Sequence, residues 1–556
     1  MKNLRSLALL PLATVTASLF AEGAPDADIL GALRIGSLQD LAASAGAFAD
    51  QIEAGSGANT AQLTAGANAF GLALDQELLA LVIDPQKAGQ PYALVLPVLD
   101  PEQFKANPAF KFAPLANSPE RFQITLPNGQ PMFATFVGKR LVASPLEAGL
   151  DAVLPAIRAD LDIRGLRAAG GHLALSLDTG RLYTAYKPMV DLMLMGMRSQ
   201  FAQATAQNPK APNPADIVGS LLGSVADIQD YFLRLSIDAA HLDLRSVITA
   251  RPGTDSAALF SAGRGPAIAL PGALDPESAV FGTVSASPSP EFWAAYHRMS
   301  TRLLGAFGQA DADADATKTF AETVDAFASI WDGTGSFAFF TPTQAMSGSG
   351  SAGIKDQEKA LSLIRRMPEL QKTMAAINAA QGIATELTLG EEETLGDARL
   401  IQATQSYRAT SPEMEAGLQM LQKAGLDNIQ ATYAITPSRF LYAMGDDSRA
   451  ETKRLLEASS ASSDIRPSAY GLPAESTAFV ALSLPRYLGW MSRVASLPFS
   501  YDAASAPKKP GLAFTTDLVD GRADIRVRLE TTEIVSLKNT FAKPATAAAP
   551  AQTVTE

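Results

Sequence analysis

The segments HLALSLDTGRLY (His172–Tyr183) and FVALSLPRYLGW (Phe479–Trp490) share the tetrapeptide Ala-Leu-Ser-Leu, followed by a break, an arginine and an aromatic residue. Each segment is typical of a short strand that turns directly into a helix. A phrase that recurs in a distant part of the chain raises the question of an internal repeat, which is best examined before other features.

Four further pairs of similar segments occur in the same order along the chain. They are LGALRIGSLQDLAASAGAF (Leu30–Phe48) with FGTVSASPSPEFWAAYHRM (Phe281–Met299), YALVLP (Tyr92–Pro97) with FAFFTP (Phe337–Pro342), FATFVGKRLVAS (Phe133–Ser144) with YAITPSRFLYAM (Tyr433–Met444), and DLRSVI (Asp243–Ile248) with DIRVRL (Asp524–Leu529). Because one short match arises by chance and collinear matches do not, the order predicts a duplicated domain.

The first copy is expected over residues 24–262 and the second over 265–542, with a helical and hairpin insertion near 343–430. Segments of alternating polarity between the strand-to-helix phrases favour antiparallel hairpins with one wet face. The predicted fold class is therefore α+β, with two tandem diverged copies that each form an antiparallel sheet with helices packed on one face. Residues 543–556 are Ala, Pro and Thr without a core-forming pattern, and we expect a disordered tail.

The N-terminus has the order of a secretory signal peptide. Lys2 and Arg5 precede an apolar stretch, and Ala21-Glu22-Gly23 fits a small-x-small cleavage site, with a cut after Ala21 as an alternative. A buried first helix is the competing interpretation, but it explains the basic start poorly. The sequence predicts a signal peptide over residues 1–23 and a bacterial protein of the periplasm or the medium, without a transmembrane segment after the signal is removed.

Composition limits the chemistry that the chain can perform. The 556 residues are 47% apolar and carry a net charge of −12, which permits a large core and disfavours a nucleic-acid surface. The chain has no cysteine, so it has no disulfide, no thiolate metal site and no cysteine nucleophile.

The phrase LPAESTAFVALSLPRYLGW and its weaker partner ALDPESAVFGTVSASPSPEFW resemble a repeated phrase of large secreted bacterial tandem-repeat proteins that are classed as a domain of unknown function. The resemblance covers a few phrases and implies an exported bacterial repeat protein. No activity of that group is assigned, so it implies no reaction.

One stretch matches most of a calcium-binding loop. In DADADATKTFAE, the residues Asp311, Asp313, Asp315 and Glu322 stand at positions 1, 3, 5 and 12 of an EF-hand loop. The sixth position needs glycine and holds Ala316, and Lys318 replaces the usual apolar residue. The alternative is a solvated acidic turn in which Asp315 caps the next helix. Calcium is the one cofactor that the sequence suggests.

Other motifs point away from familiar enzyme classes. GSGSAG (Gly348–Gly353) matches a dinucleotide fingerprint formally, but Pro342 and the missing downstream acid favour a flexible Gly/Ser loop. The histidines His172, His241 and His297 lack the spacing of a metal site, and no nucleophile elbow occurs. Scattered carboxylate pairs leave no local signature, so a hydrolase remains an alternative.

An apolar helix is expected at Tyr186–Phe201. Val190, Met193, Leu194 and Met197 form one stripe at helical spacing, and methionine lines adaptable apolar surfaces. The stripe either fills the core of the first copy or lines a groove for an apolar ligand. The leading functional hypothesis is an exported, non-enzymatic binding or envelope scaffold protein that recognises an unknown envelope component or an apolar small molecule. A periplasmic hydrolase and a carrier of an apolar ligand are the alternatives.

Overall fold

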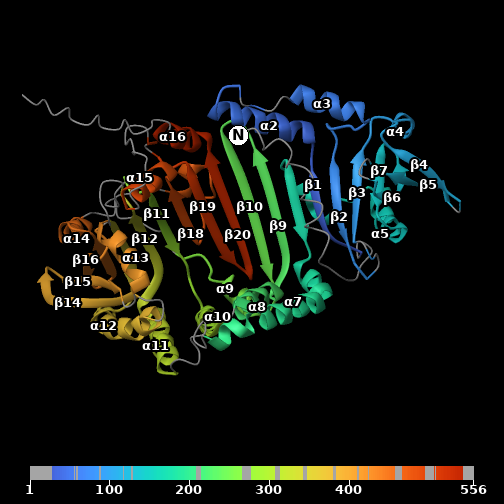
Figure 1. Ribbon diagram of the computed structural model, residues 1–556. Helices are drawn as coiled ribbons and strands as arrows, with labels where there is room; N and C mark the ends of the chain where they lie inside the picture. The colour runs from blue at the N-terminus through green and yellow to red at the C-terminus, as the bar shows by residue number, and fades with distance from the viewer. Residues whose placement is uncertain are drawn as a thin grey trace, which may run out of the picture. The chain divides into compact units, whose positions relative to one another are not determined.

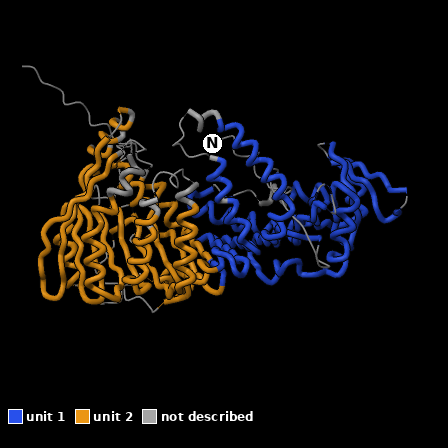
Figure 2. Tube along the Cα trace, turned by 90° about the horizontal axis from the view of Figure 1, so that it is seen from below, with its two compact units in different colours: residues 1–257, 521–524 blue, residues 258–520, 525–556 orange. Residues whose placement is uncertain are grey.

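The computed structural model describes residues 28–541 except for positions 56, 58–59, 87–88, 90, 117, 127–128, 208–213, 266–276, 307–313, 342–346, 380–382, 410–411, 424, 458–465, 495–505 and 508. The predicted signal peptide and tail lie outside this range. The chain divides into two compact units (Figure 2): unit 1 holds residues 1–257 and 521–524, and unit 2 holds residues 258–520 and 525–556. The boundaries 24–262 and 265–542 that the sequence suggests stay predictions.

Unit 1 is built around ten antiparallel strands. They are β1 (Ile29–Ile35), β2 (Leu78–Ile83), β3 (Tyr92–Pro97), β4 (Lys111–Leu115), β5 (Ser118–Thr125), β6 (Pro131–Val137), β7 (Arg140–Ser144), β8 (Leu173–Leu177), β9 (Ile228–Ile237) and β10 (His241–Ala250). Neighbouring strands pair in the order β4-β5-β6-β7-β3-β2-β1-β8-β9-β10.

The helices of unit 1 follow the strands and cover both faces of them. They are α2 (Leu38–Ile52), α3 (Thr60–Ala69), α4 (Pro101–Lys105), α5 (Glu147–Arg158), α6 (Leu166–Ala169), α7 (Thr179–Gln207) and α8 (Pro214–Ala226), with a 3-10 turn at Ile163–Gly165 and α9 (Asp255–Leu259) at the boundary. Helix α2 begins where the sequence predicts it, because the Ser37 hydroxyl accepts a hydrogen bond from the Asp40 N–H at 3.0 Å.

Unit 2 also contains ten strands. They are β11 (Val280–Ser285), β12 (Trp331–Phe339), β13 (Gly348–Ile354), β14 (Ile383–Leu395), β15 (Ala398–Ala409), β16 (Asn428–Ile435), β17 (Arg439–Met444), β18 (Ala478–Leu482), β19 (Leu512–Val519) and β20 (Arg522–Glu530). They pair in the order β14-β15-β16-β17-β13-β12-β11-β18-β19-β20, which repeats the order found in unit 1.

The helices of unit 2 are α10 (Pro290–Ala306), α11 (Ala314–Ile330), α12 (Gln357–Ala379), α13 (Pro412–Lys423), α14 (Ser448–Glu457), α15 (Leu484–Val494) and α16 (Thr531–Phe541), with a 3-10 turn at Pro467–Tyr470. Helix α12 packs over Ile401 and Ile435, whereas Leu455 of α14 packs over their strand neighbours Leu400 and Ala434. Because successive strand residues point to opposite faces, α12 and α14 lie on opposite faces of the strands (Figure 1).

The predicted fold class is wrong in two respects. The twenty described strands belong to one antiparallel sheet, and not to a separate sheet in each copy. Helices also cover both faces: in unit 1, α5 packs against a core that contains Val142, and α4 packs against its neighbours Leu141 and Ala143. The reason is visible in strands such as Leu78–Ile83, which are apolar at every position and need cover on both sides.

Two of the sequence matches also differ from the structure. YALVLP forms β3, but FAFFTP ends β12, whose place in the pairing order is that of β2. The Ala-Leu-Ser-Leu phrases belong to strands at corresponding places, β8 and β18, but at different positions in them. Ser176 lies inside β8 opposite Ala32, whereas Ser483 follows the last residue of β18 and precedes α15.

Candidate functional site

A cavity of about 460 Å³ lies in unit 2, where β11, β12, β13 and β17 reach the same end of their pairing, next to α14. Its walls come from five separate stretches of the chain. The lining residues are Ser278, Ala338, Thr341, Ser347, Gly348, Ser349, Met444, Asp447, Ala450, Glu451 and Arg454. A volume of this size falls within the range of small-molecule sites, which is about 300–1,000 Å³. We call this the hydroxyl cavity.

The Gly/Ser stretch Gly348–Gly353, which the sequence predicts to be a flexible loop, is strand β13, so that prediction is wrong. Glycine is needed here because a Cβ on Gly348 would lie 2.3 Å from the Phe339 ring. The flanking aromatic side chains cover the bare backbone and supply the apolar surface that the glycines lack. The stretch therefore belongs to the centre of unit 2 and brings Ser349 into the cavity wall.

The cavity wall carries four buried hydroxyl groups. Thr341 and Ser347 share a hydrogen bond of 2.6 Å between their hydroxyls, and the Thr341 N–H donates to Ser347 Oγ at 2.9 Å. Ser278 and Ser349 are only 2% and 4% exposed, and among the described residues neither hydroxyl has a hydrogen-bond partner. Neither oxygen is among the fully enclosed unpaired atoms of the described chain, so both hydroxyls open onto the cavity, where water or a polar ligand can bind them.

A strained residue forms the turn beside the cavity. Phe340 has φ of 64°, which is a left-handed conformation. This conformation is energetically unfavourable for any residue other than glycine. Its ring packs 4.4 Å from the Trp490 ring and 5.8 Å from Tyr487, measured between centroids. These aromatic contacts hold the turn and so direct Thr341 toward Ser347.

Helix α14 supplies the charged side of the cavity. Glu451 accepts hydrogen bonds on both carboxylate oxygens from Arg454, at 2.8 Å and 2.5 Å. Asp447, one helical turn earlier, is exposed, and its carboxylate has no partner within the described part of the chain. The cavity therefore offers neutral hydroxyls, one free carboxylate and a guanidinium that is already engaged.

A buried arginine contacts the Ser278 side of the cavity, and a buried glutamate lies within its electrostatic influence. The guanidinium of Arg486, 2% exposed, donates to the carbonyl oxygens of Ser278 and Pro507. Glu533 is fully buried and accepts hydrogen bonds from the N–H groups of Leu484 and Gly511. Burial raises the pKa of Glu533 and outweighs these hydrogen bonds and the attraction of Arg486. Arg486 therefore anchors the backbone at Ser278, and Glu533 fixes the start of α15 at Leu484.

Of the four predicted calcium ligands, only Glu322 has a side chain that the structure describes. Asp311 and Asp313 lie outside the described residues, and the side chain of Asp315 is not described. Glu322 lies on α11, where its carboxylate is 3.6 Å from Arg366. Among the residues described, no group of three or more His, Asp or Glu side chains is placed to hold a metal ion. Calcium binding stays a prediction.

The predicted apolar stripe lies on α7, and its interpretation as a fully buried core helix is wrong. Met193 is 48% exposed, and Val190, Leu194 and Met197 are half-buried. The neighbouring side chains Met189, Leu192 and Met195 are also exposed. The first turn of the helix is the part that enters the core, because Leu182 packs against Leu30 and Val82. Whether the exposed part binds an apolar ligand stays a prediction.

Two of the three histidines have structural partners. His172 Nδ1 accepts a hydrogen bond from the Ile237 N–H at 3.0 Å, and its Nε2 lies 3.3 Å from the Ser44 hydroxyl. His241 lies between Asp238 and Asp243 at 3.1 Å from each. His297 is on α10, and its Nε2 is buried without a partner in the described chain.

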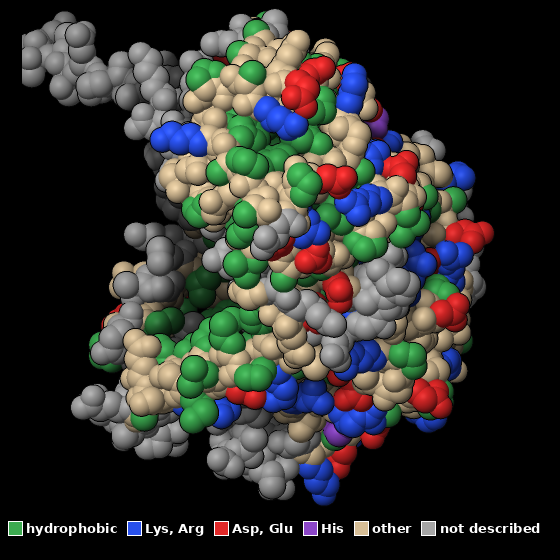
Figure 3. Space-filling model, turned by 90° about the vertical axis from the view of Figure 1, so that its right-hand side faces the viewer, with side chains coloured by type: hydrophobic (Ala, Val, Ile, Leu, Met, Phe, Trp, Pro, Cys, Tyr) green, Lys and Arg blue, Asp and Glu red, His purple; other side chains and the backbone are tan. Residues whose placement is uncertain are grey.

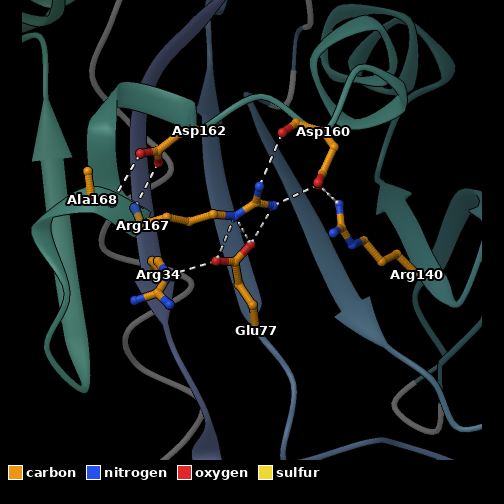
Figure 4. Close-up of polar contacts among 7 residues, drawn as sticks. All are labelled: Arg34, Glu77, Arg140, Asp160, Asp162, Arg167 and Ala168. Atoms are coloured by element: carbon orange, nitrogen blue, oxygen red, sulfur yellow. Dashed lines mark hydrogen bonds and ion pairs between the residues drawn. The ribbon is translucent and has the colours of Figure 1, made fainter.

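Charged side chains of unit 1 form a paired network and not a site of one sign. Glu77 is bound by Arg34 and Arg167, and Asp160 by Arg167 and Arg140 (Figure 4). Burial alone would raise the pKa of Glu77, but the hydrogen bonds from the two arginines outweigh burial and lower it. On the face in Figure 3, acidic and basic side chains are interspersed in the same way.

Sequence reasoning missed the residues of the hydroxyl cavity. Ser278, Asp447 and the neighbouring pair Thr341 and Ser349 come from three distant segments, and serine and threonine are too common to mark a site. The one sequence signal was GSGSAG, which was recognised as unusual but assigned to a loop.

Within the described residues, no helix is long and apolar enough to cross a membrane. The resemblance to secreted tandem-repeat proteins stays a prediction. No protein-family model, no curated protein and no solved structure matches the chain.

Proposed function

We propose that the chain is an exported bacterial binding protein that holds a small polyhydroxylated ligand, such as a sugar unit of an envelope polymer, in the hydroxyl cavity. The observation that carries the proposal is the pair of hydroxyls of Ser278 and Ser349, which line the cavity and have no hydrogen-bond partner among the described residues. A hydroxyl both donates and accepts hydrogen bonds, so it matches a ligand hydroxyl in either direction.

The charges in the cavity wall fit a neutral ligand. Asp447 adds an acceptor that can bind two hydroxyls of one ligand, and Glu451 and Arg454 neutralise each other. An anionic ligand would find no unpaired positive charge in the wall, and Asp447 leaves one negative charge there. The signal peptide expected from Lys2, Arg5 and the following apolar stretch supports the proposal, because an exported protein would meet envelope polymers.

A hydrolase acting on the same polymers is the second candidate, because Asp447 and Glu451 both line the cavity. Hydrolysis of a glycosidic bond needs one carboxylic acid to give a proton and a second carboxylate to act as base or nucleophile. Glu451 offers both of its oxygens to Arg454, so it is engaged as an acceptor. This geometry favours binding over turnover.

Calorimetric titration of the purified mature chain with glucose, N-acetylglucosamine and their disaccharides tests the proposal. We expect Ser349→Ala to weaken the best ligand at least about tenfold, because a buried hydrogen bond to ligand contributes on the order of 1.5 kcal/mol. Ser351→Ala is the matched control on the same strand, since its hydroxyl pairs with Ser336 at 3.2 Å and does not line the cavity. Failure of every sugar to bind at millimolar concentration would contradict the proposal.

Two further measurements separate the alternatives. Turnover of chromogenic glycosides that persists through purification and is lost in Asp447→Asn would establish the hydrolase. Sequencing of the mature N-terminus tests export, and we expect it to begin at Ala24 or Glu22; an uncleaved Met1 in every cell fraction would contradict it.

A further inference from the structure

The outermost strand in the pairing order of unit 2, β14, has a free edge. It pairs with β15 on one side, and no other described strand pairs with it. Figure 1 shows β14 as the outermost strand next to β15 and β16. A free edge presents a row of unpaired N–H and C=O groups, which is a template for another strand.

A second cavity, of about 670 Å³, runs along this edge. Six consecutive residues of β14, from Ala384 to Leu389, line it together with Arg365, Pro368 and Gln371 of α12 and with Ser406 and Arg408 of β15. Helix α12 packs on the face that carries Leu387 and Leu389. Ser406 and Arg408 stand opposite Glu386 and Ala384 and so belong to the other face. A cavity lined from both faces of a sheet lies at its edge.

This edge is only weakly protected over the stretch that lines the cavity, where Glu386 is the one charged residue of β14. Residues 384–389 contain no proline and no lysine, and the first bulge of β14 comes later, between Leu389 and Glu392. The corresponding edge strand of unit 1, β4, is short and carries Lys111, Pro114 and a bulge next to Pro114. Proline, lysine and bulges are the devices that block edge pairing. The β4 edge is therefore protected against pairing with another strand, whereas the β14 edge is accessible.

Polar groups along the open edge are not satisfied within the described chain. The Thr385 hydroxyl and Gln371 Oε1 are buried and have no hydrogen-bond partner. Arg408 and Glu386 are exposed on the opposite face, and neither has an ion-pair partner among the described residues.

We propose that β14 binds an extended segment of another polypeptide, which adds to the sheet as an antiparallel strand in the groove between β14 and α12. Strand addition of this kind takes affinity from main-chain hydrogen bonds and specificity from alternate side chains. We choose the antiparallel direction because every pairing in this sheet is antiparallel.

The register assigns the side chains of the partner. Residues directly opposite each other in an antiparallel pair share a face. The partner residue opposite Glu386 is therefore basic, the next one opposite Thr385 carries a hydroxyl or amide that reaches Gln371, and the third, opposite Ala384, is acidic and meets Arg408. Alanine at 384 leaves room for the Arg408 side chain to reach the edge, where it lines the cavity.

Fluorescence anisotropy with the labelled heptapeptide Val-Thr-Lys-Thr-Asp-Thr-Val tests the proposal on the whole mature chain. We expect saturable binding that falls at least about tenfold when Asp is replaced by Lys. Arg408→Glu should reverse this preference and favour the Lys peptide. Arg158→Glu, an exposed position of unit 1 with the same change in charge, is the control and should leave both affinities unchanged.

N-methylation of the peptide backbone separates strand addition from binding by side chains. Methylation of alternate residues should abolish binding for one set and spare it for the other, because alternate N–H groups of a strand point to opposite sides. Equal sensitivity of both sets, absence of binding, or an unchanged preference in Arg408→Glu would overturn the proposal. A stable dimer whose β14 edges pair and exclude the peptide would overturn it in favour of a second copy.

Discussion

Helix α7 offers a direct test of how the structure divides one helix between core and surface. Leu182, in its first turn, is 1% exposed and contacts Leu30 and Val82. Met193, about three turns later, is 48% exposed. We predict that Leu182→Ala lowers the free energy of unfolding by about 3 kcal/mol, the middle of the usual range for a buried leucine, because both apolar contact and packing are lost.

Met193→Ala should cost less than about 1 kcal/mol. Roughly half of its surface is already in water, so truncation removes less buried apolar area than at Leu182. The two substitutions lie on the same helix, so the propensity of alanine for helices favours both and cannot produce the difference.

Urea unfolding followed by far-ultraviolet circular dichroism measures both effects, and an unchanged slope with denaturant shows that the denatured state is comparable. Binding of a fluorescent fatty acid, measured on the same variants, tests the apolar-ligand prediction for the stripe at Val190, Met193, Leu194 and Met197. A loss in Met193→Ala as large as that in Leu182→Ala would refute the exposed placement. Unchanged fatty-acid binding in Met193→Ala would remove the apolar carrier.

Three further outcomes can be measured. Glu77→Gln should lower the free energy of unfolding by about 1–3 kcal/mol at pH 7, because Arg34 and Arg167 both lose the Glu77 carboxylate, although Arg167 keeps Asp160. Since the folded-state pKa of Glu77 is lowered, the gap to wild type should close as the pH falls below about 4.5, and a constant gap would contradict this. Glu533 has a raised pKa, so its contribution is fully present at acid pH and is lost as the pH rises above its ordinary value; wild type should lose stability relative to Glu533→Gln over that rise, and parallel pH profiles would exclude it. Gly348→Ala should give a lower melting temperature, because its Cβ would overlap the Phe339 ring, and an unchanged melting temperature would show that the ring moves away freely.

Local pattern predicted most of the elements and failed on how they assemble. The break at Ser37 predicts a helix, and its hydroxyl forms the expected cap. The hairpin expected in the insertion near 343–430 forms as β14 and β15, with its turn between Leu395 and Ala398. Pairing between strands that are distant in the sequence has no comparable pattern within a single segment. The phrase Ala-Leu-Ser-Leu looked like the same structural unit twice, yet one serine lies inside a strand and the other precedes a helix.

The Gly/Ser stretch shows why composition misleads at the centre of a sheet. Glycine and serine are typical of linkers because they lack apolar surface. In β13 that surface comes from the neighbours: Phe339 and Tyr442 lie where the side chains of Gly348 and Gly350 would be. A single segment does not reveal that its partners across the sheet are aromatic, so the strand could not be recognised from its own residues.

The two proposed sites rest on the same physical signal, and this explains why neither could be seen in the sequence. At both sites polar side chains lack a partner among the described residues: the Thr385 hydroxyl and Gln371 Oε1 are enclosed at the β14 edge. The hydroxyls of Ser278 and Ser349 open onto the hydroxyl cavity. An unpaired buried polar group costs on the order of 1–3 kcal/mol, which a chain bears where something else completes the hydrogen bond. The same side chains on a wet surface would carry no such cost. The missing hydrogen-bond partners are therefore a property of the folded structure and not of the residue types. If water satisfies these polar groups equally well in every variant, they no longer support a ligand at either site.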